Sequence, residues 1–576
     1  MNEKLRIVLK KAWNPPTLLV WLGLLGSVCL TVAVVSFVKT LPEALRPATI
    51  VIAVAVLLLC LWIFVRWLCS WPNLRRTLFV LACLITLVAL FYAEEDFRGK
   101  HAWNNFKREG EAQGEKFDMA SFVPPPVPDD QNFAMTPLLR PVLDYYRSTN
   151  GVRWRDTNGY ARLENLRVYG SNADYNKAPA FGSVEQDKFT DLQAWHDYYQ
   201  GNTNFPQPKL SGSPAQDILV ALGKFDAEMN ELREAAATRP ASRFPIHYEE
   251  QPPFGILLPH LSRIKGLCQL FLLRSTALME LGRGEEALAD LQMAFRFSDS
   301  VRDEPFLIDH LVRIAALTID LEGVREGLVR HVWSDAQLAR LEKYLASLNI
   351  LAEAEKNMRG ERSFGLSGLE YYRRKGFGGQ PAEMYYMGED GNSQNPPAFL
   401  GGLSLLPGGI YYQNMVVIAL LHQEFILGAV DEPKHRVFPE ISAGLTNALS
   451  HMRMTPYNLL GKMLMPAFAH SSRTSARAQT FVDEARAACA LERYRLAHGQ
   501  LPEALEAVAP QFIEQIPNDV IDGKLLRYRK NSDDGYILYS VGWNQTDDGG
   551  IVVMGKGSAP GVDANQGDWV WQMPAK

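Results

Sequence analysis

The stretch LPHLSRIKGLCQLFLLRSTALMELGRGEEALADLQMAFRFSDSV, residues 258–301, decides the fold class of most of this chain. Its apolar residues recur at spacings of three and four, which is the pattern of amphipathic α-helices with one buried face. The small residues Ala277, Gly282 and Ala287 would allow two antiparallel helices to pack closely. The same periodicity continues through residues 308–361, so we predict a mainly helical domain.

The segment ALMELGRGEEALADLQMAFRF, residues 277–297, resembles one tetratricopeptide unit. Only one such unit is visible, whereas a solenoid needs about three units to bury a continuous core. We therefore predict a single helical hairpin inside a larger helical domain over residues 138–473. Ser334 is expected to cap the N-terminus of another helix. A glycine-rich loop is expected at residues 376–409, followed by a core helix.

Three apolar runs predict a membrane domain over residues 1–93. The runs lie at about 16–38, 49–68 and 77–92. A helix needs roughly 20 residues to cross the hydrocarbon core of a bilayer. A cleavable signal peptide would explain one such run but not three. We therefore expect three transmembrane helices.

The distribution of basic residues predicts the orientation of these helices. Four basic residues precede the first run, and three lie at the end of the second run or between it and the third, against two between the first and second. The positive-inside rule then places the N-terminus in the cytoplasm, and three crossings place the rest of the chain outside. We expect a multi-pass protein of the bacterial inner membrane with its large C-terminal part in the periplasm. Its expected partners are the lipid bilayer and other envelope proteins.

Composition argues against two other classes of function. The net charge of -5 over 576 residues gives no reason to expect nucleic acid as a partner. The six cysteines form no CxxC pair, so neither a disulfide framework nor a thiolate zinc site is predicted.

Residues 94–137 are predicted to be a proline-rich linker. The segment PPPVPDDQNFAMTP, residues 124–137, has five prolines, which exclude a regular helix and favour a stiff, extended connection. A peptide-like ligand for an aromatic groove is the alternative. The chain up to about residue 251 is rich in aromatic and turn residues, and we expect short strands and loops there.

Residues 474–576 are predicted to form a small α+β domain. An alanine-rich helix starts near Thr474 and should stop near Gly499, and QLPEALEAV forms a second, short helix. Strands LLRYR and YILYSVG follow, joined by the turn NSDDG, and DWVWQM provides a third strand. A small antiparallel sheet is therefore expected after the helix.

This region resembles the globular domain of the major pseudopilins of type II secretion. The resemblance rests on three phrases, A-L-x-x-Y-x-x-x-x-G-x-x-P, P-x-D-x-x-x-G before an aromatic strand, and Y-S-x-G. They are matched by Ala490, Leu491, Tyr494, Gly499 and Pro502, by Pro517, Asp519, Gly523 and Tyr528, and by Tyr539, Ser540 and Gly542. The whole chain also resembles multi-domain bacterial membrane proteins that share PPPVPDDQNFA, which implies no activity.

The pseudopilin resemblance also implies a structural Ca²⁺ ion. In that family the loop after Y-S-x-G binds calcium through aspartates and backbone carbonyls, in keeping with the six to eight oxygens that calcium takes. The metal ligands implied here are Asn544, Asp547, Asp548, Asp563 and Asp568. The alternative is a hydrophilic turn whose Asp and Asn side chains cap backbone amides.

No catalytic constellation is present in the sequence. GxxxxGK[ST], HExxH and GxSxG are absent, as is GxGxxG after a strand. His422 and Glu424 are two residues apart and so do not share a helix face. His247 with Glu249 and Glu250 could be an acid–base group, with a solvated charged loop as the alternative.

Two hypotheses about function follow, and whether the chain is an enzyme stays open. The first is a membrane-anchored envelope protein with a binding or scaffolding role, associated with type II secretion or pilus-like machinery. The alternative is a membrane-tethered hydrolase with its site in the helical domain, beneath the loop at 376–409. No catalytic residue and no organic cofactor is predicted.

Overall fold

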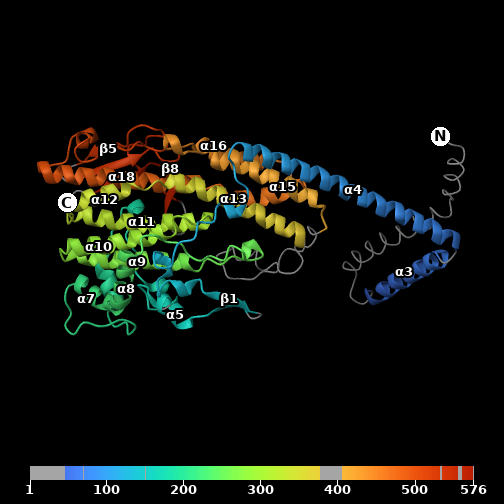
Figure 1. Cartoon of the computed structure of the whole chain (residues 1–576), viewed down its shortest axis with the longest axis horizontal. Coiled ribbons are helices and arrows are strands. Elements are labelled where there is room, and N and C mark those ends of the chain that lie inside the picture. The colour runs from blue at the N-terminus through green and yellow to red at the C-terminus, as the bar shows by residue number, and fades with distance from the viewer. Residues whose placement is uncertain are drawn as a thin grey trace. The chain divides into compact units, whose positions relative to one another are not determined.

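The computed structural model describes residues 46–68, 71–148, 151–170, 172–376, 405–531, 535–555 and 561–574. These residues belong to two compact units, one within Met1–Arg98 and one within Gly99–Lys576. Both units are mainly helical, and small antiparallel sheets occur in the second (Figure 1). The first apolar run, most of the expected glycine-rich loop and part of the NSDDG turn lie outside the described residues.

The described part of the first unit is helix with exposed apolar side chains. Helix α3, Arg46–Leu68, contains the second apolar run, and helix α4, Trp71–Ala112, contains the third. Leu58 is 58% exposed and Phe79 is 70% exposed. Apolar surface in water is unfavourable by about 25 cal/mol per Å², so these side chains require an apolar environment.

Two helical segments in the described part are long and apolar enough to cross a membrane. They are Trp71–Ala112 and Pro253–Glu280. The apolar window of the first is entirely unburied, whereas half of the window of the second is buried inside the protein. The second segment therefore has the character of a core helix, and α4 is the better candidate for a membrane span. The expected number of three spans stays a prediction.

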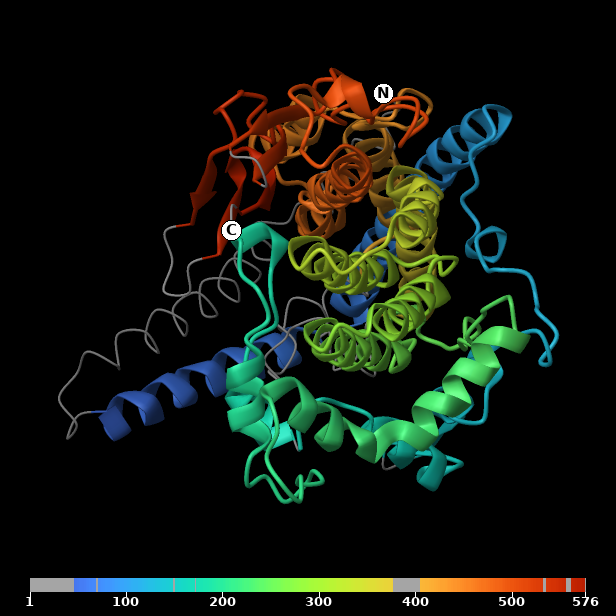
Figure 2. The same cartoon turned by 90° about the vertical axis from the view of Figure 1, so that its left-hand side faces the viewer.

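The second unit is built around long helices that lie side by side, so that Figure 2 shows several of them end on. Helix α11 lies at the centre of this packing, in contact with α9, α10, α13 and α18. The helices from residue 260 onward are α9 His260–Glu280, α10 Gly284–Ser300, α11 Leu307–Val329, α12 Asp335–Ala346, α13 Ile350–Lys375, α15 Gly408–Leu421, α16 Pro439–His451, α17 Leu459–Leu464 and α18 Ser471–His498.

The predicted helical hairpin is confirmed. Helices α9 and α10 are joined by three residues, and Gly282 in this connection has a φ of 70°, which favours glycine. Ala277 and Ala287 are fully buried between the helices of the core, as their small size allows. Ser334 caps α12 as expected, because its hydroxyl accepts from the backbone N–H of Gln337.

For residues 134–251 short strands and loops were predicted, and the strand part of this prediction is largely wrong. Loops are present, but among the described residues the named strands form one two-stranded hairpin and the other named elements are helices. Each helix is short, so little periodicity is visible, but side-chain caps start three of them, from Asp156, Asp191 and Ser213. The elements are β1 Tyr145–Ser148, β2 Gly151–Trp154, α5 Thr157–Asn165, α6 Leu192–Tyr199, α7 Pro214–Leu222 and α8 Asp226–Thr238.

The segment predicted as a proline-rich linker, 94–137, is only partly a connection. Its first part continues α4 to Ala112, and its last part enters the core. Phe133 is fully buried. Its ring centroid lies 5.6 Å from that of Phe297 and 4.8 Å from the guanidinium of Arg296. This end of the segment is therefore anchored to α10 rather than free.

The C-terminal region has the predicted order of helix and antiparallel sheet. Helix α18 ends before Gly499, whose φ of 76° closes it. The sheet has the order β5–β6–β9, and β6 pairs antiparallel with both neighbours. A second pair, β7–β8, was not predicted. The strands are β5 Arg527–Lys530, β6 Tyr536–Ser540, β7 Val552–Met554, β8 Val562–Gly567 and β9 Trp569–Met573.

The expected boundary at residue 473 falls inside a continuous core. Helix α18 packs against α11, α12 and α13 as well as against β6 and β9. One buried cluster joins Leu321 of α11, Leu341 of α12, Leu491 of α18 and Trp571 of β9. The C-terminal region and the helical region thus share their hydrophobic core.

Candidate ligand-binding site

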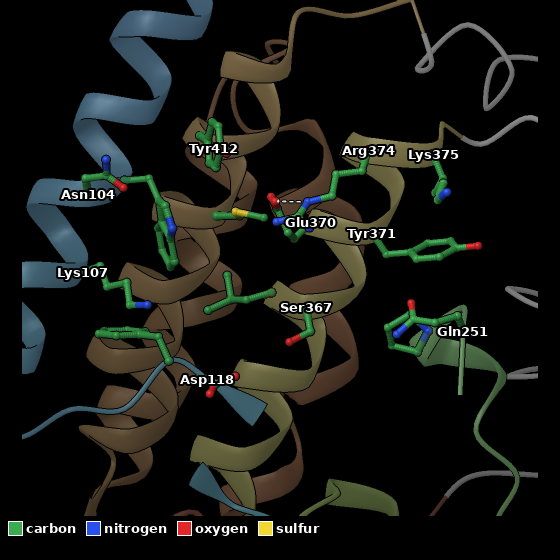
Figure 3. A pocket seen from close by; sticks show the side chains of 15 residues that line it. Asn104, Lys107, Asp118, Gln251, Ser367, Glu370, Tyr371, Arg374, Lys375 and Tyr412 are labelled. Atoms are coloured by element: carbon green, nitrogen blue, oxygen red, sulfur yellow. Dashed lines mark hydrogen bonds and ion pairs between the residues drawn. The ribbon is translucent and has the colours of Figure 1, made fainter. Parts of the chain in front are cut away.

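A cavity of about 850 Å³ lies between the last turns of α4, the C-terminal half of α13 and the start of α15 (Figure 3). The 3₁₀-helix Pro253–Gly255 closes one side of it. We call this cavity the α4–α13 pocket. It borders the ends of α13 and α15, where the chain leaves and re-enters the described part.

A buried ion-pair group fixes the chain after α4 onto α13. Gly114, with a φ of 89°, turns the chain back, and Glu115 then pairs with Arg359 and Arg362 of α13. The side chain of Arg362 is fully buried and its guanidinium lies 4.6 Å from the ring of Phe117. Breaking a buried pair leaves an uncompensated charge, so this contact holds the pocket wall in place.

Aromatic and aliphatic side chains form the apolar wall. The ring centroids of Trp103 and Phe117 lie 5.8 Å apart, and Phe106 stacks beside Trp103. A Cβ at Gly110 would lie 2.7 Å from the Phe117 ring, so glycine at this position allows the close packing. Further lining comes from α13 and α15, namely Leu366, Met415 and Tyr412.

Charged side chains of both signs occupy the rim. Three basic residues, Lys107, Arg374 and Lys375, and two acidic residues, Asp118 and Glu370, line the pocket. Figure 3 shows Lys107 extending from α4 toward the space between the helices, and Arg374 bonded to Glu370.

Two arginines neutralise the acidic group on α13. The Glu370 carboxylate accepts hydrogen bonds from Arg373 at 2.8 and 2.9 Å and from Arg374 at 2.7 Å. Partial burial raises the pKa of Glu370, but these hydrogen bonds outweigh it and the pKa lies below its usual range. The Arg373 guanidinium also lies 4.9 Å from the ring of Tyr412. Glu370 is therefore ionised at neutral pH and held by two cations.

The one aliphatic hydroxyl in the described lining of the pocket has no base bonded to it. The described lining includes neither a histidine nor a cysteine, and Ser367 is its one aliphatic hydroxyl. A nucleophilic serine needs a base within hydrogen-bond reach. No hydrogen bond joins Ser367 to a base in the described part, so Ser367 is not activated as a nucleophile by a described neighbour.

The structure brings some of the implied calcium ligands together, but as hydrogen-bond acceptors. The buried Asp568 carboxylate accepts from the backbone N–H of Asp548 at 3.3 Å and of Gly550 at 2.5 Å. Asp548 in turn accepts from the side-chain amide of Asn544 at 2.9 Å. Asp547 accepts from a neighbouring backbone N–H, in the geometry of a capped turn.

Asp563 stands apart from these residues. Its carboxylate accepts from the backbone N–H of Asn565, on β8, and Asn565 contacts Arg473 of α18. Within the described part, no group of three or more His, Cys, Asp or Glu side chains is arranged to hold a metal ion. The contacts seen are those of the capped turn, and calcium binding stays a prediction.

The two histidine groupings noted in the sequence have structural surroundings. His422 is fully buried, neither of its ring nitrogens has a hydrogen-bond partner among the described residues, and burial lowers its pKa to about 3. Glu424 is exposed, so the two do not form a pair. His247 bonds the backbone carbonyl of Leu143 at 3.0 Å and lies 3.5 Å from Glu249.

Sequence reasoning missed a buried polar cluster between α9 and α11. His260 lies 2.8 Å from Glu304, and both side chains are buried next to Asp309. Burial raises the pKa of Glu304 and of Asp309 well above the usual range and lowers that of His260 to about 4. The cluster is closed to solvent, so it is a core feature rather than a site for substrate.

A second missed grouping contains the residue types of a hydrolase. Ser211 donates to Asp217 at 2.7 Å, and His196 lies 3.2 Å from the same carboxylate oxygen. In a catalytic triad the histidine lies between the serine and the acid. Here the aspartate lies between them, and it also accepts from the backbone of Gly212, so the arrangement anchors a loop.

The residues of the α4–α13 pocket were also missed, because much of its wall lies in the segment predicted to be a linker. A signal was present in KHAWNNFKREG, residues 100–110, where aromatic, basic and glycine residues recur at helical spacing. No family model matches the chain, and neither does a curated protein or a solved structure.

Proposed function

We propose that this chain is a membrane-anchored envelope protein that binds a ligand through the α4–α13 pocket. The observation that carries the proposal is the pocket itself, about 850 Å³ in volume with an aromatic wall and a charged rim. Small-molecule sites are typically clefts of roughly 300–1,000 Å³ with apolar walls and a few polar groups.

The location of the protein is part of the proposal. The exposed apolar surface of α4 supports anchoring in a membrane, with the other two apolar runs as further spans of a multi-pass protein. The distribution of basic residues supports the bacterial inner membrane with the second unit on the periplasmic side. The resemblance to pseudopilins supports an association with type II secretion or pilus-like machinery.

The binding role is favoured over a membrane-tethered hydrolase. The hydrolase hypothesis requires a nucleophile or a water activated by a base next to the pocket. The pocket holds Ser367 without such a base, and the Ser211–Asp217–His196 group has the wrong order of contacts.

A variant that fills the pocket tests the proposal. Asn104 is exposed on the pocket side of α4 and makes no hydrogen bond in the described part, so Asn104→Trp adds volume without removing a contact. Glu109→Trp, at another exposed position of α4 that does not line the pocket, is the matched control. The full-length chain, purified in nanodiscs, would be examined by native mass spectrometry for co-purified ligand.

We expect the wild type and Glu109→Trp to retain a bound species that Asn104→Trp loses. Equal thermal stability of the two tryptophan variants would show that the loss comes from filling the pocket. A bound species that is retained by all three proteins, or absent from all three, would contradict the proposal.

A further inference from the structure

We propose that the ligand of the α4–α13 pocket is an amphipathic anion, with a carboxylate or phosphate group attached to an aromatic or aliphatic portion. This inference rests on the proposed function, because it names the chemistry of the ligand bound there. It is carried by two observations, the excess of cations at the rim and their position next to the aromatic wall.

The charge balance at the rim favours an anion. The pocket is lined by three basic and two acidic side chains. One of the two acids, Glu370, is already held by Arg374 and by Arg373, which stands just outside the lining. Lys375 forms no ion pair in the described part, and Lys107 has only an exposed partner, Glu111, at 3.5 Å. The second acid, Asp118, sets one negative charge against the two positive charges of Lys107 and Lys375, so an incoming anion would meet a net positive charge from these three side chains.

The geometry of the pocket supplies places for both parts of such a ligand. Lys107 extends from α4 toward the cavity. Trp103, one helical turn away on the same face of α4, also lines the cavity. A charged group at Lys107 would leave the attached apolar portion against Trp103 and Phe117. Flat apolar groups bury well against aromatic rings, and Lys provides a point charge suited to either carboxylate or phosphate.

The chemistry fits a membrane phospholipid and a soluble organic acid equally well. The two sources share an anionic group next to an apolar group, and the experiment must distinguish them. Since the rim is partly exposed, attraction between the lysines and the ligand should fall with salt, given a Debye length of about 8 Å at physiological ionic strength.

Four probes test the inference on the full-length chain in phosphatidylcholine nanodiscs, with empty nanodiscs as blanks. The soluble pair is 2-naphthoate and its neutral analogue 2-naphthamide. The lipid pair is dihexanoyl-phosphatidylglycerol and zwitterionic dihexanoyl-phosphatidylcholine. Calorimetric titration should show at least one anion binding about tenfold or more tightly than its uncharged or zwitterionic partner. Which anion does so identifies the source.

Charge reversal then locates the effect. Lys107→Glu should remove most of the preference for the anion, whereas Lys265→Glu, at an exposed lysine of α9 outside the pocket, should preserve it. Raising the salt concentration from about 50 to 500 mM should weaken the binding of the anion and leave the binding of 2-naphthamide unchanged.

The outcomes separate this inference from the proposed function. If neither anion binds, or if each anion binds no more tightly than its partner in the wild type, the ligand class is wrong. Binding of 2-naphthamide that Asn104→Trp abolishes would then still support a ligand-binding pocket. Binding of any probe that is unaffected by Asn104→Trp would overturn both.

Discussion

The aspartate-rich loop after β6 and the α4–α13 pocket are both polar regions, but their side chains are used differently. In the loop, the carboxylates of Asp547, Asp548 and Asp568 accept hydrogen bonds from the loop itself. In the pocket, Lys107, Asp118 and Lys375 surround an open cavity. A high density of polar residues marks a ligand site only where the fold leaves their bonding capacity free.

The largest effect on stability is expected when the buried hydrogen-bond acceptor of the loop is removed. Asp568→Ala would leave the backbone N–H groups of Asp548 and Gly550 without their acceptor, and we expect a loss of about 2–3 kcal/mol in the free energy of unfolding. Denaturant unfolding of the full chain measures it. Asp568→Asn keeps one acceptor oxygen and should lose less. A loss under about 0.5 kcal/mol would show that the carboxylate is not needed as a cap.

The pH dependence of stability tests whether His422 is buried and uncharged in the fold. Burial lowers the pKa of His422 to about 3, against about 6.5 in the unfolded chain, so below pH 6.5 the unfolded state binds a proton that the folded state does not. The stability linked to His422 is therefore present above pH 6.5 and is lost as pH falls toward 3.

By pH 5 this loss should be on the order of 2 kcal/mol relative to pH 7. His422→Leu removes the titrating group. Between pH 7 and pH 5, the variant should therefore lose about 2 kcal/mol less stability than the wild type. Unfolding curves at the two pH values give both quantities. Equal losses in the two proteins would show that His422 is protonated or solvated in the fold.

Adding calcium tests whether the loop is a capped turn or an ion-binding site. If the loop is the capped turn seen here, millimolar Ca²⁺ should leave the melting temperature of the full chain unchanged. A rise that disappears in an Asp547→Ala/Asp548→Ala double variant would instead identify the loop as a calcium site, as the pseudopilin resemblance implies. EDTA-treated protein is the starting point for both measurements.

The smallest effect is expected for Asp547 alone. Its side chain is about half exposed, and its hydrogen-bond partner Gly549 stays accessible to water. Asp547→Ala should therefore change the free energy of unfolding by no more than about 0.5 kcal/mol. A larger loss would mean that its 3.7 Å contact with Arg527 supports the sheet.

Much of the fold followed from local patterns in the sequence. The period of the α9–α10 hairpin, the stop of α18 at Gly499 and the apolar, aromatic-rich segments that form β6 and β9 each have a local physical cause, and each was predicted. The short helices after residue 138 carry too few turns to show a period, which is why α5–α8 were missed. For α5, α6 and α7 the local signal was the side-chain cap, such as Ser213 with Gln216, whereas α8 has no side-chain cap.

Local sequence patterns could not predict the pocket, because the segments that line it are far apart in the chain. Trp103 and Ser367 are separated by more than 260 residues, and they line the same cavity through the Glu115 contact with α13. The prolines around residue 125 indicated a spacer but did not predict the structure of the segments on either side of them. The implied calcium ligands were close in sequence, and proximity alone did not determine whether they bind an ion or backbone amides.

The position of α18 has a consequence for biosynthesis. Helices α11, α12 and α13 bury one face against α18, but α18 is completed about 120 residues after α13 ends. At roughly 5–20 residues per second, the ribosome needs on the order of 6 to 25 seconds to supply it. During that interval the nascent chain exposes an apolar face, so a chain truncated before Ser471 is expected to be a substrate for chaperones and proteases rather than a smaller functional protein.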